Sequence, residues 1–177
     1  MRKQISVTMI LLIAVMAVGA SACTKEAGQP LTSAWANYEN EEYGFRLHYP
    51  ADWHKDDEPY ENTVVGFWTS SGTGAYYEVH VMIIAGSCQA CNLEENVDAA
   101  REGYQSEVGT TVLNDRYIEV QGRRGHEFIL SDDMGIWRDV YFVANNKDYM
   151  LSCLAPQNKY SQYEGIFEEI VNSFVIR

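Results

Sequence analysis

The cysteines have the widest chemical repertoire of the side chains in this 177-residue chain. Cys88 and Cys91 form a C-x-x-C pair in the segment GSCQACNLEE, between a strand-like run and a helix-like pattern. Thiol–disulfide oxidoreductases use such a placement because a helix N-terminus lowers the pKa of the first thiol. Here Asn92 is the better helix cap, so both cysteines precede the helical amides. A structural disulfide or inert thiols are therefore favoured, and thiol–disulfide exchange by Cys88 and Cys91 is the alternative.

Cys153 lies near the end of a predicted strand. If Cys23 is modified, Cys88, Cys91 and Cys153 form an odd set, and one thiol stays unpaired. Cys153 is then either a buried free thiol or the partner of one of the two loop cysteines. Both alternatives stay open at the level of sequence.

The N-terminal segment MRKQISVTMILLIAVMAVGASAC has the order of a secretory signal: two basic residues, an apolar run and small residues. The run is shorter than the roughly 20 residues of a membrane-spanning helix. We expect a signal peptide at residues 1–22, a lipidated Cys23 as in bacterial lipoproteins, and a polar tether over residues 23–37. Ala20 stands where the lipoprotein motif usually has a branched aliphatic residue. Ordinary cleavage after Ala22, giving a freely secreted protein, is thus the alternative.

Metal binding is the next chemistry that the residue types allow. His48, His54 and a run of acids, Asp56, Asp57 and Glu58, lie close together in sequence. They match neither a zinc-type ligand spacing nor an EF-hand calcium loop. The three acids are weak candidates for holding calcium, and a solvated loop is favoured. No cofactor is expected.

Motifs of nucleophilic and phosphate chemistry are absent from the sequence: it has no G-x-S-x-G, S-x-x-K or phosphate-binding glycine loop. We assign no catalytic residue and expect no enzyme activity. The formal net charge is −12, and loss of residues 1–22 would remove two basic residues and no acids, giving about −14. Such a chain repels nucleic acid, which is excluded as a partner.

Hydrophobic periodicity predicts a domain over residues 38–177 that mixes strands and helices. Phe45, Leu47 and Tyr49 alternate with polar residues until Pro50 ends the run, which indicates a strand. Further strands are expected at 63–69, 76–85, 111–120, 123–131, 136–144 and 149–154, with hairpin turns at 121–122 and 145–148. Apolar stripes with helical spacing run from Leu93 to Val108 and from Tyr160 to Phe174. The short links favour an α+β fold with one mainly antiparallel sheet of about six or seven strands and helices packed on it.

Three segments resemble the PsbP-like superfamily, which includes DcrB-like bacterial lipoproteins. YGFRLHYPADW matches the signature near the start of those domains at Tyr43, Gly44, Phe45, Leu47, Tyr49, Pro50 and Trp53. GRRGHEFILSD resembles the central strand of the family, and the segment from Tyr141 to Ile176 resembles its closing hairpin and last helix. Physically the signature is framework: apolar side chains of one strand, a proline turn and a tryptophan over the sheet edge.

The resemblance implies an α/β/α sandwich and an accessory or binding role, without a shared catalytic constellation. We therefore expect an extracytoplasmic lipoprotein, attached to the membrane through Cys23, that binds an envelope or membrane-complex protein. Thiol–disulfide exchange and weak cation binding are the competing functions.

Overall fold

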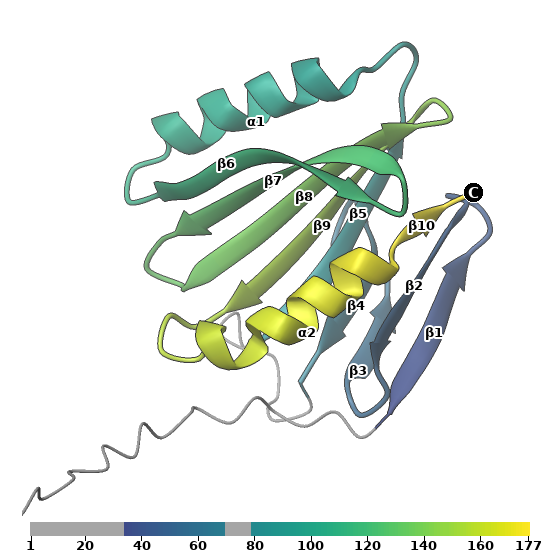
Figure 1. The fold of residues 1–177 in the computed structure, drawn as a ribbon, viewed down its shortest axis with the longest axis horizontal. Coiled ribbons are helices and arrows are strands. Elements are labelled where there is room, and N and C mark those ends of the chain that lie inside the picture. Colours follow the sequence, from purple (N-terminus) through teal and green to yellow (C-terminus); the bar gives the residue numbers. More distant parts are fainter. Residues whose placement is uncertain (1–33, 70–78) are drawn as a thin grey trace, which may run out of the picture.

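The structure is a computed structural model that describes residues 34–69 and 79–177. Within this part of the chain it contains two helices and ten strands, arranged around one large sheet (Figure 1). In chain order they are β1 (Trp35–Asn40), β2 (Phe45–Pro50), β3 (His54–Asp57), β4 (Thr63–Trp68), β5 (His80–Ser87), α1 (Leu93–Ser106), β6 (Thr111–Val120), β7 (Arg123–Ser131), β8 (Ile136–Ala144), β9 (Lys147–Ala155), α2 (Tyr160–Ser173) and β10 (Val175–Ile176).

The large sheet has seven strands in the order β3-β4-β5-β9-β8-β7-β6, and every neighbouring pair is antiparallel. Its two longest hairpins turn at the predicted places. Gln121 and Gly122 join β6 to β7, and Asn145 and Asn146 join β8 to β9. All four have positive φ, between 51° and 74°, as two-residue turns that match the twist of the strands require.

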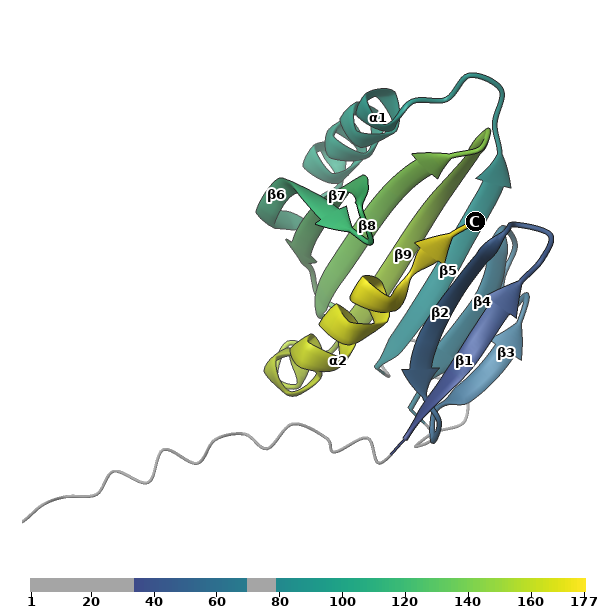
Figure 2. The same ribbon diagram turned by 45° about the vertical axis from the view of Figure 1, so that its right-hand side comes forward.

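A second sheet of three strands, β1-β2-β10, corrects the prediction of a single sheet. β2, the strand that carries the family signature, pairs with β1 and with the two-residue β10 at the end of the chain. Its apolar side chains, Phe45 and Leu47, are fully buried in the main core. The Phe45 ring packs against Tyr149 of β9, so β2 lies over the face of the large sheet instead of extending its edge (Figure 2).

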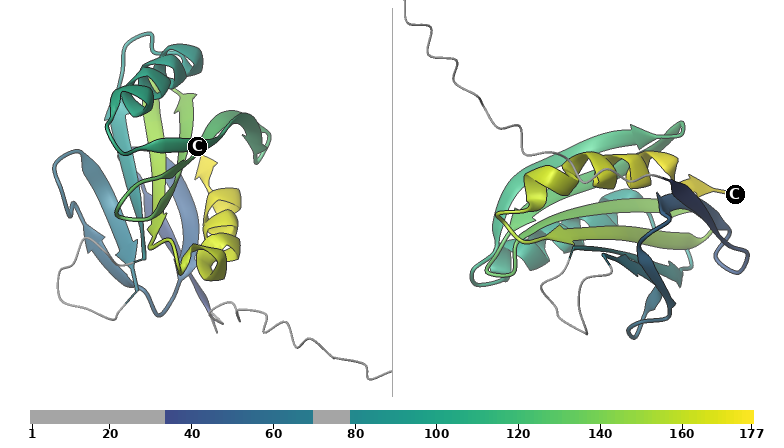
Figure 3. Two further views of the ribbon diagram at one scale, coloured as in Figure 1. Left: turned by 90° about the vertical axis from the view of Figure 1, so that its left-hand side faces the viewer. Right: turned by 90° about the horizontal axis from the view of Figure 1, so that it is seen from below.

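The two helices cover opposite faces of the large sheet (Figure 3). α1 buries Leu93 and Val97 against Phe128 and Leu130 on one face. α2 and the small sheet share the other face, where Phe167 joins the main core. The observed arrangement is thus the expected α+β sandwich, with a small sheet added to one layer.

The start of α1 is as predicted, whereas its end is not. The Asn92 side chain accepts a hydrogen bond of 2.8 Å from the backbone N–H of Glu95, so Asn92 is the N-cap. The helix ends at Ser106, and Val108, the last member of the predicted stripe, is fully exposed. Gly109 follows with a φ of +95°, a conformation that ends helical geometry.

The signature segment is framework, as its pattern predicted. Gly44 has a φ of +70°, in the left-handed region that glycine adopts without strain. Tyr49 stacks on Phe67 at 4.3 Å between ring centroids. Trp53 is 7% exposed and lies against Tyr163 of α2.

The predicted domain start at residue 38 is three residues late, because β1 already begins at Trp35. The signal segment, most of the tether and residues 76–78 of one predicted strand lie outside the described residues. Neither described helix is long and apolar enough to cross a bilayer.

Candidate functional site

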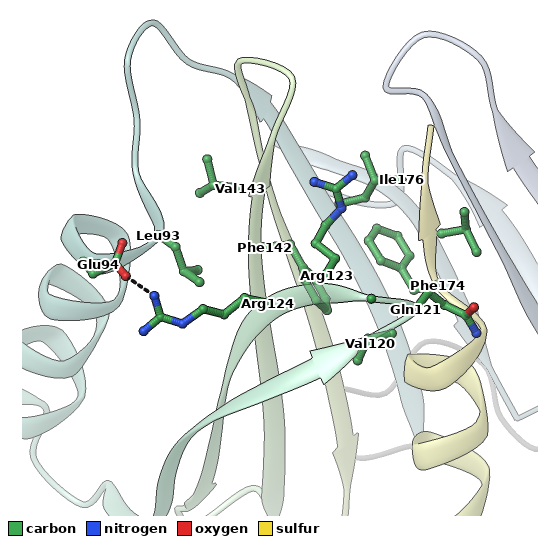
Figure 4. A pocket seen from close by; sticks show the side chains of 12 residues that line it. Leu93, Glu94, Val120, Gln121, Arg123, Arg124, Phe142, Val143, Phe174 and Ile176 are labelled. Carbon is green, nitrogen blue, oxygen red and sulfur yellow. Dashed lines mark hydrogen bonds and ion pairs between the residues drawn. The ribbon is translucent and has the colours of Figure 1, made fainter.

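A groove of about 460 Å³ lies where the β6–β7 hairpin, the start of α1, β8 and β10 meet (Figure 4). The hairpin contributes Gln121, Gly122 and two arginines, and the end of the chain contributes Val175 and Ile176. The groove therefore joins segments from the middle and the end of the sequence. Both the I′-type hairpin turn and the short strand β10 are needed to form it.

The floor of the groove is apolar and closely packed. Phe142 and Phe174 stack at 5.5 Å between ring centroids and are 1% and 2% exposed, respectively. Gly125 permits this packing, since a Cβ there would lie 2.5 Å from the Phe142 ring. The two rings of the floor therefore expose almost none of their apolar surface.

The walls carry two arginines with different surroundings. Arg124 pairs with Glu94 at 2.6 Å and lies over the Tyr117 ring, 3.9 Å from its centroid. Arg123 is half-buried and points toward Ile176 (Figure 4), and the described residues offer it no ion-pair partner. Burial raises the pKa of the Tyr149 hydroxyl, and the Arg123 charge opposes that rise, which places the guanidinium near this ring.

The backbone of β10 borders the groove with one unpaired edge. β10 pairs with β2 alone in the described sheets. The N–H of Arg177 donates to the carbonyl of Gly44 at 2.8 Å. Because amides alternate in direction along a strand, the N–H and C=O of Ile176 point away from β2. These two backbone groups have no partner strand in the described sheets, and Ile176 lines the same groove as Arg123.

The predicted cysteine site lies elsewhere. Cys88 and Cys91 form a disulfide in the connection from β5 to α1, and the N–H of Cys88 donates to the carbonyl of Asn146. Cys153 is a free thiol in the main core, where burial raises its pKa to about 12. Such a thiol is a poor nucleophile at neutral pH.

The three weak metal candidates do not converge. Asp56 and Asp57 are neighbours on β3, so their side chains point to opposite faces, and Asp57 pairs with Lys55. Glu58 follows with a φ of 55°. Over residues 34–69 and 79–177 no three His, Cys, Asp or Glu side chains gather where they could hold a metal ion.

Sequence reasoning did not identify a buried polar network beneath α1. The carboxylate of Asp139 accepts hydrogen bonds of 2.6 Å from Ser152 and from Tyr104, and Tyr104 also contacts the hydroxyl of Tyr141. Burial raises the pKa of Asp139. The signal was present as the polar pair Arg138-Asp139 inside an apolar strand pattern, in a strand buried on both faces.

On the other face of the sheet, Glu127 is buried between two arginines. It accepts from Arg138 at 2.6 Å and from Arg116 at 2.7 Å. Both networks satisfy their charges or hydrogen bonds internally, which is the pattern of framework polar groups. The groove is the better candidate for recognition, because the guanidinium of Arg123 has no ion-pair partner among residues 34–69 and 79–177.

Comparisons with known proteins agree with this architecture. The family model described as PsbP-like protein matches residues 9–176. No curated protein sequence matches the chain significantly.

Three solved structures show the same fold. The cyanobacterial PsbP (CyanoP) from Synechocystis sp. PCC 6803 aligns with a TM-score of 0.62 and 10% identity, over 81% of this chain and 93% of its own. LpqN of Mycobacterium tuberculosis, described as involved in cell envelope biogenesis, aligns with a TM-score of 0.62 and 11% identity, over 81% and 90%. A protein of unknown function from Pseudomonas aeruginosa, PA94, described as a putative regulator, aligns with a TM-score of 0.55 and 13% identity, over 81% and 97%. At these identities the likeness extends to the fold alone.

Proposed function

Because the chain belongs to the PsbP-like protein family, we propose that it is an extracytoplasmic accessory module, anchored by lipid at Cys23, that binds a partner protein of the cell envelope. The observation that carries this proposal is the groove beside β10. It combines a half-buried guanidinium that has no ion pair in the described residues with an open backbone edge.

A binding role fits the chemistry of the groove better than catalysis does. Its lining residues include no serine, cysteine, histidine or lysine, so it holds no nucleophile or neutral base beside Arg123. The only carboxylate in the lining, that of Glu94, is engaged by Arg124. The groups that remain available can hold a ligand but cannot transfer a proton or form a covalent intermediate.

The envelope location is supported by the signal-like N-terminus and by the description of LpqN, a protein of similar fold, as involved in cell envelope biogenesis. The net charge of −12 argues against nucleic acid as the partner. A protein partner at the membrane surface is consistent with these features.

Site-specific photo-crosslinking in native cells tests the proposal. A photoreactive residue in place of Val175, which lines the groove, is expected to form a protein adduct, and Arg123→Ala should reduce its yield. The matched control carries the photoreactive residue at Lys159, an exposed position at the start of α2. The helix of 14 residues places Lys159 about 20 Å from the groove end of α2. Absence of an adduct at 175, or the same adduct from both positions, would reject the groove as the partner site.

A further inference from the structure

Arg123 is an exception within an acidic protein. The chain has 25 Asp and Glu against 13 Lys and Arg, so cations have an excess of possible partners. Arg101, Arg116, Arg124, Arg138 and Arg177 each form an ion pair in the described structure. Arg46 and Lys159 form none there, but both are exposed to water. Lys147 is half-buried and forms none either, but its ammonium donates to the carbonyl of Glu42 at 2.7 Å. Arg123 is half-buried in a groove, where a missing counter-charge costs more than at the open surface.

The unpaired edge of β10 places a second requirement on the ligand of the groove. Ile176 presents one backbone donor and one backbone acceptor away from β2, as the hydrogen bond from Arg177 to Gly44 implies. An extended peptide satisfies both groups by pairing as an additional strand. A small anion could pair with the guanidinium but would leave the carbonyl of Ile176 unsatisfied.

The apolar part of the groove argues against a lipid tail as the occupant. Val120, Phe142 and Phe174 are 5%, 1% and 2% exposed, so an acyl chain would find little apolar surface left to cover. Binding of acyl chains depends on the apolar area that they remove from water. The available groups are instead the guanidinium and the backbone, since the Gln121 amide nitrogen already donates to the carbonyl of Asn172 at 2.7 Å.

We propose that the groove binds an extended peptide segment with one or two carboxylate side chains, paired to Arg123 and to the backbone of Ile176. This inference rests on the proposed function and names the chemistry of the partner. The carboxylate and the guanidinium form charge-assisted hydrogen bonds, which are stronger than neutral ones. The excess negative charge of the chain repels strongly acidic ligands, which limits the carboxylates to a few.

Nuclear magnetic resonance titration of the purified domain tests this chemistry directly. The probe is a five-residue acetylated peptide amide with a central glutamate flanked by valine and threonine, and its control has glutamine in place of glutamate. We expect the glutamate peptide to shift the resonances of the Ile176 amide and the Arg123 side chain, with at least about ten-fold higher affinity than the control. A charge-assisted interaction of about 1.4 kcal/mol corresponds to that factor.

Variants separate recognition from folding. Arg123→Gln should remove the preference for glutamate, Arg123→Lys should keep part of it, and Lys159→Gln should leave it unchanged. Equal affinity for both peptides, absence of any shift at Ile176 at millimolar peptide, or a shift produced only by decanoate would overturn the inference.

The two proposals fail in different ways. If position 175 forms a protein adduct but the domain binds both peptides equally, the proposed function stands. The inference that the partner segment carries carboxylates is then rejected. Binding of the glutamate peptide without any adduct in cells keeps the chemistry of the groove and rejects the envelope partner.

Discussion

Asp139 is a buried carboxyl group whose protonation is coupled to folding. Its carboxylate lies beneath α1 without a cation, between the hydroxyls of Ser152 and Tyr104. Burial raises its pKa above the ordinary value, and the two hydrogen bonds only partly oppose that rise. The folded state therefore binds a proton at Asp139 more tightly than the unfolded state does.

The Asp139→Asn substitution should stabilise the protein at neutral and alkaline pH. The asparagine imitates the protonated acid, because its oxygen can accept from Ser152 while its amide donates to Tyr104. With a raised pKa in the folded state, the wild type loses stability as pH rises from about 4 through that pKa. The difference in free energy of unfolding between the variant and the wild type should thus be largest at pH 8 and should decrease toward pH 4. Urea unfolding across this range measures it.

A control variant, Asp133→Asn, removes the same charge at an exposed position nearby. Its effect on the free energy of unfolding should be within about 0.5 kcal/mol at every pH. Burial lowers the pKa of His126, so its protonation in acid destabilises the folded state. Because His126 is present in all three proteins, this contribution cancels when their free energies of unfolding are compared. A constant gap between Asp139→Asn and the wild type over the whole range would contradict a raised pKa.

At the scale of elements, α1 is held near both ends. The Cys88–Cys91 disulfide fixes the connection that leads into its N-cap, and Tyr104 near its last turn bonds to Asp139 of β8. Between these points the helix buries Leu93 and Val97. The disulfide thus belongs to the attachment of α1 to the sheet.

Replacing both Cys88 and Cys91 with serine should lower the free energy of unfolding by about 2 kcal/mol. This is the chain-entropy value for a closed loop of about four residues. Urea unfolding of the oxidised wild type and of the double variant measures the difference. Cys153→Ala is the comparison that removes a thiol without removing a cross-link.

Thiol–disulfide exchange predicts a different outcome. A redox-active pair would be reduced readily by glutathione, and its loss would leave stability almost unchanged while abolishing exchange with a dithiol substrate. Resistance of the Cys88–Cys91 bond to glutathione, together with the expected destabilisation, would remove that function.

Periodicity predicts the elements that bury one regular face. Phe45 and Leu47 on β2 and the helical stripe ending at Phe174 identify their elements because buried apolar groups recur at fixed spacing. β1 and β3 carry no buried residue, since every residue of both strands is exposed or half-buried. Each pairs with the next strand along the chain, β1 with β2 and β3 with β4, so it is the lack of a buried periodic face that hides them from local patterns.

The candidate site is harder to predict than the fold. Arg123 follows a recognisable hairpin turn. Whether its guanidinium finds an ion-pair partner among the described residues depends on which segments pack around it. The pairing of β10 with β2 joins residues more than 120 positions apart. Asp139 forms a polar pair with Arg138 inside an apolar strand, but its burial beneath α1 and its contact with Tyr104 depend on how the helix packs.

At the scale of the whole molecule, the start of β1 and the groove lie at opposite ends of the small sheet. Trp35 pairs with Pro50 at the start of β1, whereas Ile176 pairs with Phe45 at the other end of β2. The separation along β2 is five residues, or about 17 Å.

Anchoring and recognition should consequently be separable. We expect the wild type to fractionate with membranes and Cys23→Ala to move to the soluble extracytoplasmic fraction, because multiple acyl chains are what give stable attachment. Mass spectrometry of the wild-type N-terminus provides the independent measurement. The purified Cys23→Ala protein should keep its preference for the glutamate peptide, since the groove lies at the far end of the domain. If the wild type is recovered unmodified and soluble, the protein is secreted, and its partner must then be sought away from the membrane surface.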